Sequence, residues 1–294
     1  MRTLLTYLCG VWYTCLYAQY SQYPAHQSQV FRLASSYQPG MQNQEGHSQV
    51  VLNYQKYIGP FSQINQKLLL ANVNLSGDTL RTKHNIAAKL QSEQEGEYIV
   101  RNRVYAGYGW HRNIFKEYWL GAGVYMGMAG YAYQGGSAYT QGSDWAPDGD
   151  VGIVFYRPQK LTLAFSTNQA FNSIVRPKDL EFRWTRYYTG YVQRYFEHDK
   201  EWTSSLYLQH ILRTDVYSNT DIGAYLSYKQ HLLLGTNFTF GNKLSAMAGF
   251  QNLPLRIGTV SVLFNYNFPF ITQQRTRISA YELTVLYGFF THGK

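Results

Sequence analysis

An acidic stretch is the first candidate for a ligand site in this sequence. Residues 144–150 contain three aspartates and a glycine, a combination that could attract calcium. Ala146, however, stands where the EF-hand pattern needs an oxygen ligand, and Phe155 stands where it needs a glutamate. The EF-hand interpretation therefore fails, and the alternative is an acidic outer loop that binds a cation only incidentally.

The histidines and serines give no recognisable catalytic motif. The eight His residues have neither the HExxH pattern nor another metal-ligand spacing, and no Gly-x-Ser-x-Gly sequence is present. Ser204, Ser205 and His210 could form a Ser–His site built from separate strands, or could be ordinary lumen and interface residues. His198 lies between two acidic residues in a predicted turn, where a solvated charge cluster is the simpler interpretation. We therefore predict no catalytic residue, no metal site and no cofactor, and expect the protein not to be an enzyme.

Two glycine pairs resemble parts of a nucleotide-binding loop. Gly107-Tyr108-Gly109 and Gly121-Ala122-Gly123 each match a fragment of the motif, but neither completes it. Both lie within predicted strands rather than at a turn between a strand and a helix. We interpret them as glycines that ease the curvature of a closed sheet.

Three arginines share one tyrosine-rich predicted strand, at residues 183–196. They are Arg183, Arg186 and Arg194. Such a strand could line a pore selective for anions, or the arginines could mark the ends and the lumen face of a long strand.

These residues must be positioned by strands, and residues 281–290 give the clearest pattern. Odd positions from Tyr281 to Phe289 are apolar or aromatic, while Glu282, Thr284 and Gly288 alternate with them. Leu286 is the exception. The pattern predicts a barrel strand in which Tyr281 faces lipid and Glu282 faces the lumen, paired with a strand arginine or lysine.

Composition favours the same fold. The chain is 17% aromatic and only 15% charged, against roughly 25% charged residues in an average soluble protein. Its mean hydropathy of −0.35 argues against a helical membrane protein, whereas in a barrel only alternate residues meet lipid. The net charge is +9, but lysines and arginines are scattered without a basic run, so nucleic acid is not an expected partner.

The N-terminus indicates export. Arg2 precedes the apolar segment Leu4 to Leu16, and the pattern predicts a signal peptide over residues 1–18. The alternative, a single membrane anchor, needs about 20 apolar residues, more than this segment contains. Both cysteines, Cys9 and Cys15, lie within the signal peptide. Residues 19–47 are polar and contain Pro39-Gly40, which predicts a periplasmic lead-in with a turn.

The rest of the chain reads as one domain, an all-β, transmembrane, antiparallel up-and-down β-barrel of about 14 strands over residues 48–290, with a tail at 291–294. The predicted strands are 48–56, 66–74, 84–92, 98–110, 117–133, 149–156, 160–167, 183–196, 201–210, 219–229, 231–240, 243–250, 257–268 and 279–290. Long connections at 134–148, 168–182 and 211–218 alternate with short ones, as expected when outer loops are longer than periplasmic turns. The very short outer turn at 241–242 weakens this rule.

Several segments, in order, resemble the PorP/SprF family of type IX secretion system outer-membrane proteins from the Bacteroidetes. They are Tyr20-Ser21-Gln22-Tyr23; Tyr37-Gln38-Pro39-Gly40, where the family has Asn-Pro-Ala; Tyr54-Gln55-Lys56-Tyr57-Ile58; the paired strands at 147–156 and 161–166; and Ser279-Ala280-Tyr281-Glu282-Leu283, with Tyr281 in place of the family's His. Further departures at Gln38, Gly40, Gln55 and Ile58 mark a divergent member. Tyr37, Pro39, Gly40 and Glu282 are therefore the candidate structural or partner-binding residues.

The resemblance implies a barrel in the outer membrane that helps the type IX apparatus to dock, assemble or anchor its machinery and cargo. The implied partners are type IX components, such as periplasmic lipoproteins or peptidoglycan-binding proteins, a secreted adhesin, and outer-membrane lipid. A diffusion channel or small-solute transporter on the same fold is the alternative function. A lumen closed by side chains would argue against a channel.

Overall fold

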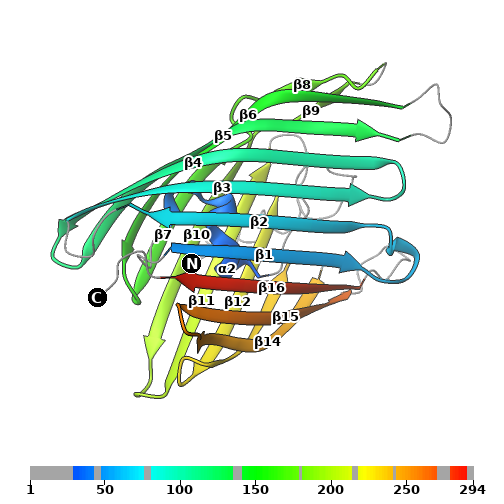
Figure 1. The fold of residues 1–294 in the computed structure, drawn as a ribbon. Helices are drawn as coiled ribbons and strands as arrows, with labels where there is room; N and C mark the ends of the chain where they lie inside the picture. The colour runs from blue at the N-terminus through cyan, green and yellow to red at the C-terminus, as the bar shows by residue number, and fades with distance from the viewer. Residues whose placement is uncertain are drawn as a thin grey trace, which may run out of the picture.

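The structure is a computed structural model that describes residues 29–42, 48–75, 81–134, 141–178, 181–213, 218–240, 243–269 and 279–289. Fourteen antiparallel strands form a closed barrel (Figure 1), in which the first strand, β1 (Ser48–Tyr57), pairs with the last, β16 (Ala280–Phe289). The predicted fold class is confirmed.

The other barrel strands follow one another around the wall in chain order. They are β2 (Asn65–Asn74), β3 (Thr82–Glu95), β4 (Ile99–Phe115), β5 (Tyr118–Tyr133), β6 (Gly142–Arg157), β7 (Leu161–Asn168), β10 (Tyr187–Glu197), β11 (Trp202–Arg213), β12 (Asn219–Tyr228), β13 (Leu232–Thr239), β14 (Lys243–Pro254) and β15 (Thr259–Pro269). A short 3-10 helix, η2 (Gly59–Phe61), lies between β1 and β2.

Side chains alternate between the lumen and the outer surface along every strand, because successive residues of a strand point to opposite faces. In β16, Glu282 and Thr284 are fully buried, whereas Leu283 between them is 40% exposed. The exposed side of the wall is apolar and is rich in leucine, isoleucine, valine and phenylalanine. This is the surface that meets the hydrocarbon of a membrane.

The connections divide the barrel into two ends. Ser48 and Phe289 are paired, so both chain ends of the barrel lie at one end, together with the short connections 116–117, 158–160 and 229–231. Longer connections, including 134–141 and 169–186, lie at the other end. We assign the end with the short turns to the periplasm. The predicted turn at 241–242 lies outside the described residues.

One predicted loop is instead part of the wall. The connection predicted at 134–148 is shorter, because β6 already begins at Gly142, and residues 144–150 belong to that strand. Proline, glycine and aspartate in this stretch signalled a loop, but Asp148 and Asp150 face the lumen and are bonded there. The connection 169–186 carries a small two-stranded sheet of β8 (Ile174–Val175) and β9 (Phe182–Arg183).

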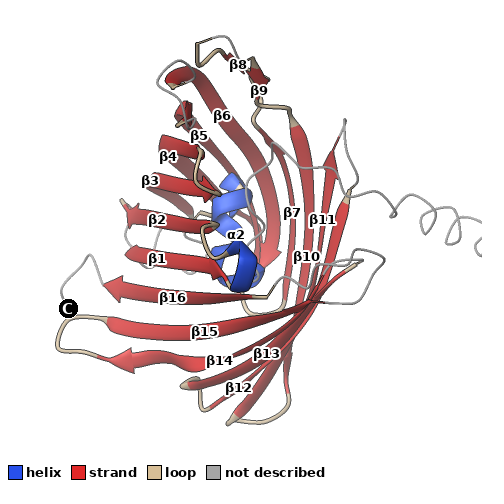
Figure 2. Ribbon diagram, turned by 90° about the vertical axis from the view of Figure 1, so that its right-hand side faces the viewer, coloured by secondary structure: helices blue, strands red, loops and turns tan. Residues whose placement is uncertain are grey.

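The segment predicted as a periplasmic lead-in enters the barrel. Its described part contains the helix α2 (Val30–Tyr37) and the 3-10 helix η1 (Pro39–Met41), and Figure 2 shows α2 inside the ring of strands. Residues 29–42 are called the plug below. The predicted signal peptide, 1–18, and tail, 291–294, lie outside the described residues.

Among the described residues, no helix has the length and apolar character needed to cross a bilayer.

Candidate functional site

The plug is held in the lumen by apolar contacts on two sides. Leu33 of α2 belongs to a buried cluster with Val51, Leu68 and Leu70 of β1 and β2. Leu286 of β16 packs against this cluster, which explains why its position breaks the alternation of that strand. The lumen face is apolar there because it contacts a helix rather than water.

The other side of the plug contacts the tyrosine-rich part of the wall. Ala34 and Met41 share a buried cluster with Tyr156 of β6, Tyr191 of β10 and Tyr207 of β11. The plug therefore spans the barrel and contacts both walls. Large side chains that pack against a helix, rather than an open channel, account for many of the lumen tyrosines.

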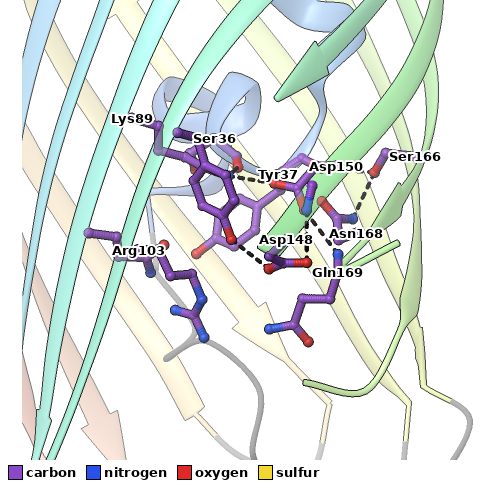
Figure 3. Close-up of polar contacts among 12 residues, drawn as sticks. Ser36, Tyr37, Lys89, Arg103, Asp148, Asp150, Ser166, Asn168 and Gln169 are labelled. Carbon is purple, nitrogen blue, oxygen red and sulfur yellow. Dashed lines mark hydrogen bonds and ion pairs between the residues drawn. The ribbon is translucent and has the colours of Figure 1, made fainter. Parts of the chain in front are cut away.

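A buried ion pair fixes the end of α2 to the wall (Figure 3). Lys89 Nζ of β3 donates to the main-chain oxygen of Ser36 at 3.1 Å and to Asp150 Oδ2 of β6 at 2.6 Å. Both charged side chains are 5% exposed. The ammonium group lies at the C-terminal end of the helix, where the helix dipole favours a positive charge.

Further hydrogen bonds follow the plug towards its end. Ser166 Oγ donates to the main-chain oxygen of Tyr37 at 2.8 Å, and Gln38 Nε2 donates to the main-chain oxygen of Thr189 at 2.9 Å. Gln42 is held twice by side chains: Asn85 Nδ2 donates to its Oε1 at 2.9 Å, and His111 Nε2 donates to its main-chain oxygen at 2.7 Å. Strands from both halves of the barrel therefore recognise the plug through its main chain as well as its side chains.

Two glycines allow the close approach of η1 to the wall. A Cβ added to Gly40 would meet the main-chain carbon of Ile153 at 2.8 Å. A Cβ added to Gly123 of β5 would overlap the main-chain oxygen of Pro39. The glycine pair that contains Gly123 therefore leaves room for the plug. The sequence interpretation had given these glycines only the role of easing the curvature of the sheet.

Three of the four candidate residues named from the sequence belong to this contact. Tyr37 is 6% exposed, and Pro39 and Gly40 are buried in η1 against the wall. Glu282 lies on the lumen face of β16 and is fully buried. The sequence did not indicate Gln38, Gln42 or Lys89, although the apolar spacing of Leu33, Ala34 and Tyr37 was a signal for a helix.

A second set of charges lies beyond the plug on the same wall. Tyr105 Oη donates to Asp148 Oδ2 at 2.6 Å, and Arg103 Nη1 contacts Glu93 Oε1 at 2.8 Å. The Arg103 guanidinium also lies over the ring of Trp184, 4.6 Å from its centroid. Each carboxylate of the acidic stretch therefore already has a protein partner: Lys89 for Asp150, Tyr105 for Asp148 and the main-chain N–H of Arg176 for Asp144.

Glu282 is bonded across the seam where the barrel closes. Asn53 Nδ2 of β1 donates to Glu282 Oε1 at 2.8 Å and to Thr284 Oγ1 at 2.8 Å. Lys243 of β14 interacts electrostatically with the same carboxylate. Glu282 therefore helps to join the last strand to the first.

Asn53→Leu is expected to lower the free energy of unfolding by about 1–3 kcal/mol, because it leaves the buried Glu282 carboxylate without this donor. Asn72→Leu is the matched control, since Asn72 faces the lumen from β2 and its amide has no hydrogen-bond partner among the described residues. Denaturant unfolding, followed by the heat-modifiable electrophoretic mobility of the barrel, measures the free energy of unfolding of both variants. Equal losses for the two variants would contradict the assigned role of Asn53.

The sequence-derived catalytic candidates do not come together. Ser205 faces the lumen and donates nothing to His210, whose Nδ1 lies 2.9 Å from Thr220 Oγ1. His198 Nε2 does lie 2.7 Å from Ser204 Oγ, but within one exposed hairpin. The neighbouring Asp199 carboxylate accepts hydrogen bonds from the main-chain N–H groups of Glu201 and Trp202, which lower its pKa.

The three arginines do not line the lumen. Arg194 and Arg183 are exposed, and Arg186 donates to the main-chain oxygen of Ala170 in the outer connection. The lumen-facing residues of β10 are Tyr187, Thr189, Tyr191 and Gln193. The predicted pore lining and lumen-face placement are therefore wrong, whereas Arg186 and Arg194 do lie near the two ends of β10. Over the described ranges, no group of three His, Cys, Asp or Glu residues could hold a metal ion.

The sequence of this chain matches a known family. The family model for the type IX secretion system membrane protein PorP/SprF matches residues 19–287. The chain belongs to the PorP/SprF family. This PorP/SprF protein is thus an outer-membrane β-barrel component of the type IX secretion system, and the resemblance identified from the sequence is confirmed.

Several solved structures have the same fold. The CymD monoaromatic hydrocarbon channel is 10% identical, with 91% of this chain and 94% of that chain covered at a TM-score of 0.57. The toluene transporter TbuX of Ralstonia pickettii is 9% identical, with 88% and 93% covered at 0.56. A Pseudomonas aeruginosa FadL homologue is 8% identical, with 88% and 94% covered at 0.53. At these identities the likeness of the PorP/SprF barrel shows the fold alone. No curated protein sequence matches the chain.

Proposed function

We propose that this PorP/SprF protein is a non-enzymatic docking and assembly component, which anchors secretion or gliding machinery and its cargo at the outer membrane. The observation that carries the proposal is the plug. Residues 29–42 span the lumen, contact both walls and are hydrogen-bonded to several strands. A barrel closed in this way offers its rims and loops to partners rather than a path for solutes.

The expected partners are type IX components on the periplasmic side, such as lipoproteins or peptidoglycan-binding proteins, together with a secreted adhesin as cargo. The periplasmic end combines short turns with the start of β1, the strand that follows the plug in the chain. A partner that binds there would contact the rim of the wall beside β1.

Affinity purification of the tagged protein from detergent-solubilised outer membrane tests this proposal. We expect type IX components to co-purify and surface display of type IX cargo to fall when the gene is deleted. Normal cargo display in the deletion strain, together with purification of the barrel alone, would count decisively against a docking role. Re-expression of the intact gene is the control for effects on neighbouring genes.

The likeness in fold to a monoaromatic hydrocarbon channel and a toluene transporter favours one second candidate, a diffusion channel or small-solute transporter. The two functions predict opposite results in planar bilayers. A docking barrel with its plug in place should conduct ions poorly, whereas a channel should conduct steadily or should accelerate uptake of its solute. Steady conductance by the intact protein would favour the second candidate.

A further inference from the structure

A groove crosses the outer surface of the wall on strands β16, β1, β2, β3 and β4. Its volume is about 710 Å³. Its lining includes Leu52, Leu90 and Val104, which are between 41% and 53% exposed, whereas the adjacent Asn53 and Leu68 are 3% exposed. Because lumen-facing residues are the buried ones in this barrel, the groove opens towards the membrane.

The strand register arranges the lining in two parallel rows. One row is aliphatic: its members are direct neighbours on adjacent strands, in the order Val285, Leu52, Leu69, Leu90, Val104. The next row is one step towards the outer end and is polar at its centre, in the order Tyr54, Lys67, Ser92, Asn102. On β2, β3 and β4 the wall therefore changes from aliphatic to polar between one outward-facing residue and the next, whereas on β16 the second row ends in Leu283.

A tryptophan closes the end of the polar row. Trp145 of β6 is the cross-strand neighbour of Gly130, which is in turn the neighbour of Asn102. A Cβ on Gly130 would meet the indole ring at 2.5 Å, so the glycine lets the ring lie across β5 towards the groove. Tyr54 lies at the opposite end. Aromatic rings of this kind are typical of the boundary between hydrocarbon and headgroups.

Lys67 supplies the exposed charge of the groove, because the other cation of the lining, Arg103, is 2% exposed and is paired with Glu93. It is exposed on the membrane-facing side of β2, and none of the ion pairs found among the described residues involves it. The lining contains no acidic side chain. A cation beside a serine hydroxyl and an asparagine amide gives three donors for phosphate oxygens, directly above an aliphatic surface.

We infer that this groove binds one phosphate-bearing lipid of the outer leaflet. The acyl chains lie along the aliphatic row, and the phosphate lies at Lys67 with Ser92 and Asn102 as further donors. A lipid fits better than a protein segment, because the groove faces the membrane and its two rows match the two halves of an amphiphile. The site lies outside the lumen and does not depend on the proposed docking role.

Native mass spectrometry of the full-length protein, purified from outer membrane in mild detergent, tests the inference. We expect one phosphate-bearing lipid to remain bound to the wild-type barrel. Lys67→Gln should reduce the retained fraction about tenfold, as expected for loss of one charge-assisted contact. Arg194→Gln is the matched control, since Arg194 is an exposed, outward-facing cation on β10, outside the groove, and it should retain the lipid.

The double variant Ser92→Leu with Asn102→Leu tests the polar row without changing charge and should also lose the lipid. Heat-modifiable mobility verifies that each variant is folded. Equal retention by Lys67→Gln and the wild type would overturn the inference, as would a wild-type barrel that carries no lipid or carries a peptide instead. Each of these measurements uses the isolated barrel. A negative result for lipid binding therefore does not argue against the docking role, and a negative result for docking does not argue against the lipid site.

Discussion

Gly123→Val is expected to displace η1 from the wall and to raise the ionic conductance of the purified barrel. The new side chain would occupy the position of the Pro39 main-chain oxygen, and a main-chain atom inside a packed segment cannot move aside as a flexible side chain would. Overpacking of this kind costs about 1–3 kcal/mol. Because the hydrogen bonds of the plug follow in sequence from Tyr37 to Gln42, the shift should weaken several of them together.

Planar-bilayer recordings measure the conductance, and limited proteolysis measures the protection of residues 29–42. Gly190→Val is the matched control, because a Cβ at Gly190 meets no atom within 4 Å. That variant should behave like the wild type in both assays. If Gly123→Val keeps the low conductance and the protease protection of the wild type, the contact between η1 and β5 does not hold the plug.

Lys89→Met is expected to lower the free energy of unfolding by about 3–5 kcal/mol, because it leaves Asp150 as a buried charge without its cation. It also removes the donor to Ser36 at the end of α2. The double variant Lys89→Met with Asp150→Leu should recover much of this loss, since apolar side chains of similar volume often replace a buried ion pair at little cost. Urea unfolding with folded and unfolded barrels separated by electrophoresis gives both values.

Lys229→Met provides the comparison for an exposed pair. Lys229 lies 3.2 Å from Glu201 in the periplasmic turns, and both side chains are about half exposed. We expect little or no loss, because water and salt screen an exposed ion pair. A loss as large as that of Lys89→Met would mean that the effect comes from the methionine rather than from the buried pair.

The strands could be predicted because each carries its own period-two signal. In β16 and β15 the alternation is nearly complete, and the predicted ranges 279–290 and 257–268 lie within two residues of the observed ones. The predicted strand boundaries were wrong where polar residues belong to a strand and face the lumen, because polar residues were taken as a sign of a loop. Asp148 was placed in the connection 134–148 because its partner Tyr105 is distant in sequence.

The plug could not be predicted by the same reasoning. Its helix has only eight residues, and its surroundings are rich in glutamine and serine, which favour turns. The contacts that order it come from strands throughout the barrel, so a local window contains only Leu33, Ala34 and Tyr37 as signals. Leu286 was a second signal in hindsight: an apolar residue on a polar face indicates that something apolar lies opposite.

The separation in sequence between the plug and its partners constrains the order of folding. Arg32 bonds to Gln251, 219 positions later, and Gln38 bonds to Thr189, 151 positions later. The plug precedes the wall strands in the chain, yet it can dock only after most of the wall has formed, because loops of this length close late. Insertion of the barrel into the membrane and closure of its lumen by the plug should therefore be two separate kinetic events. Closure should follow insertion, because the plug docks on a wall that has already formed.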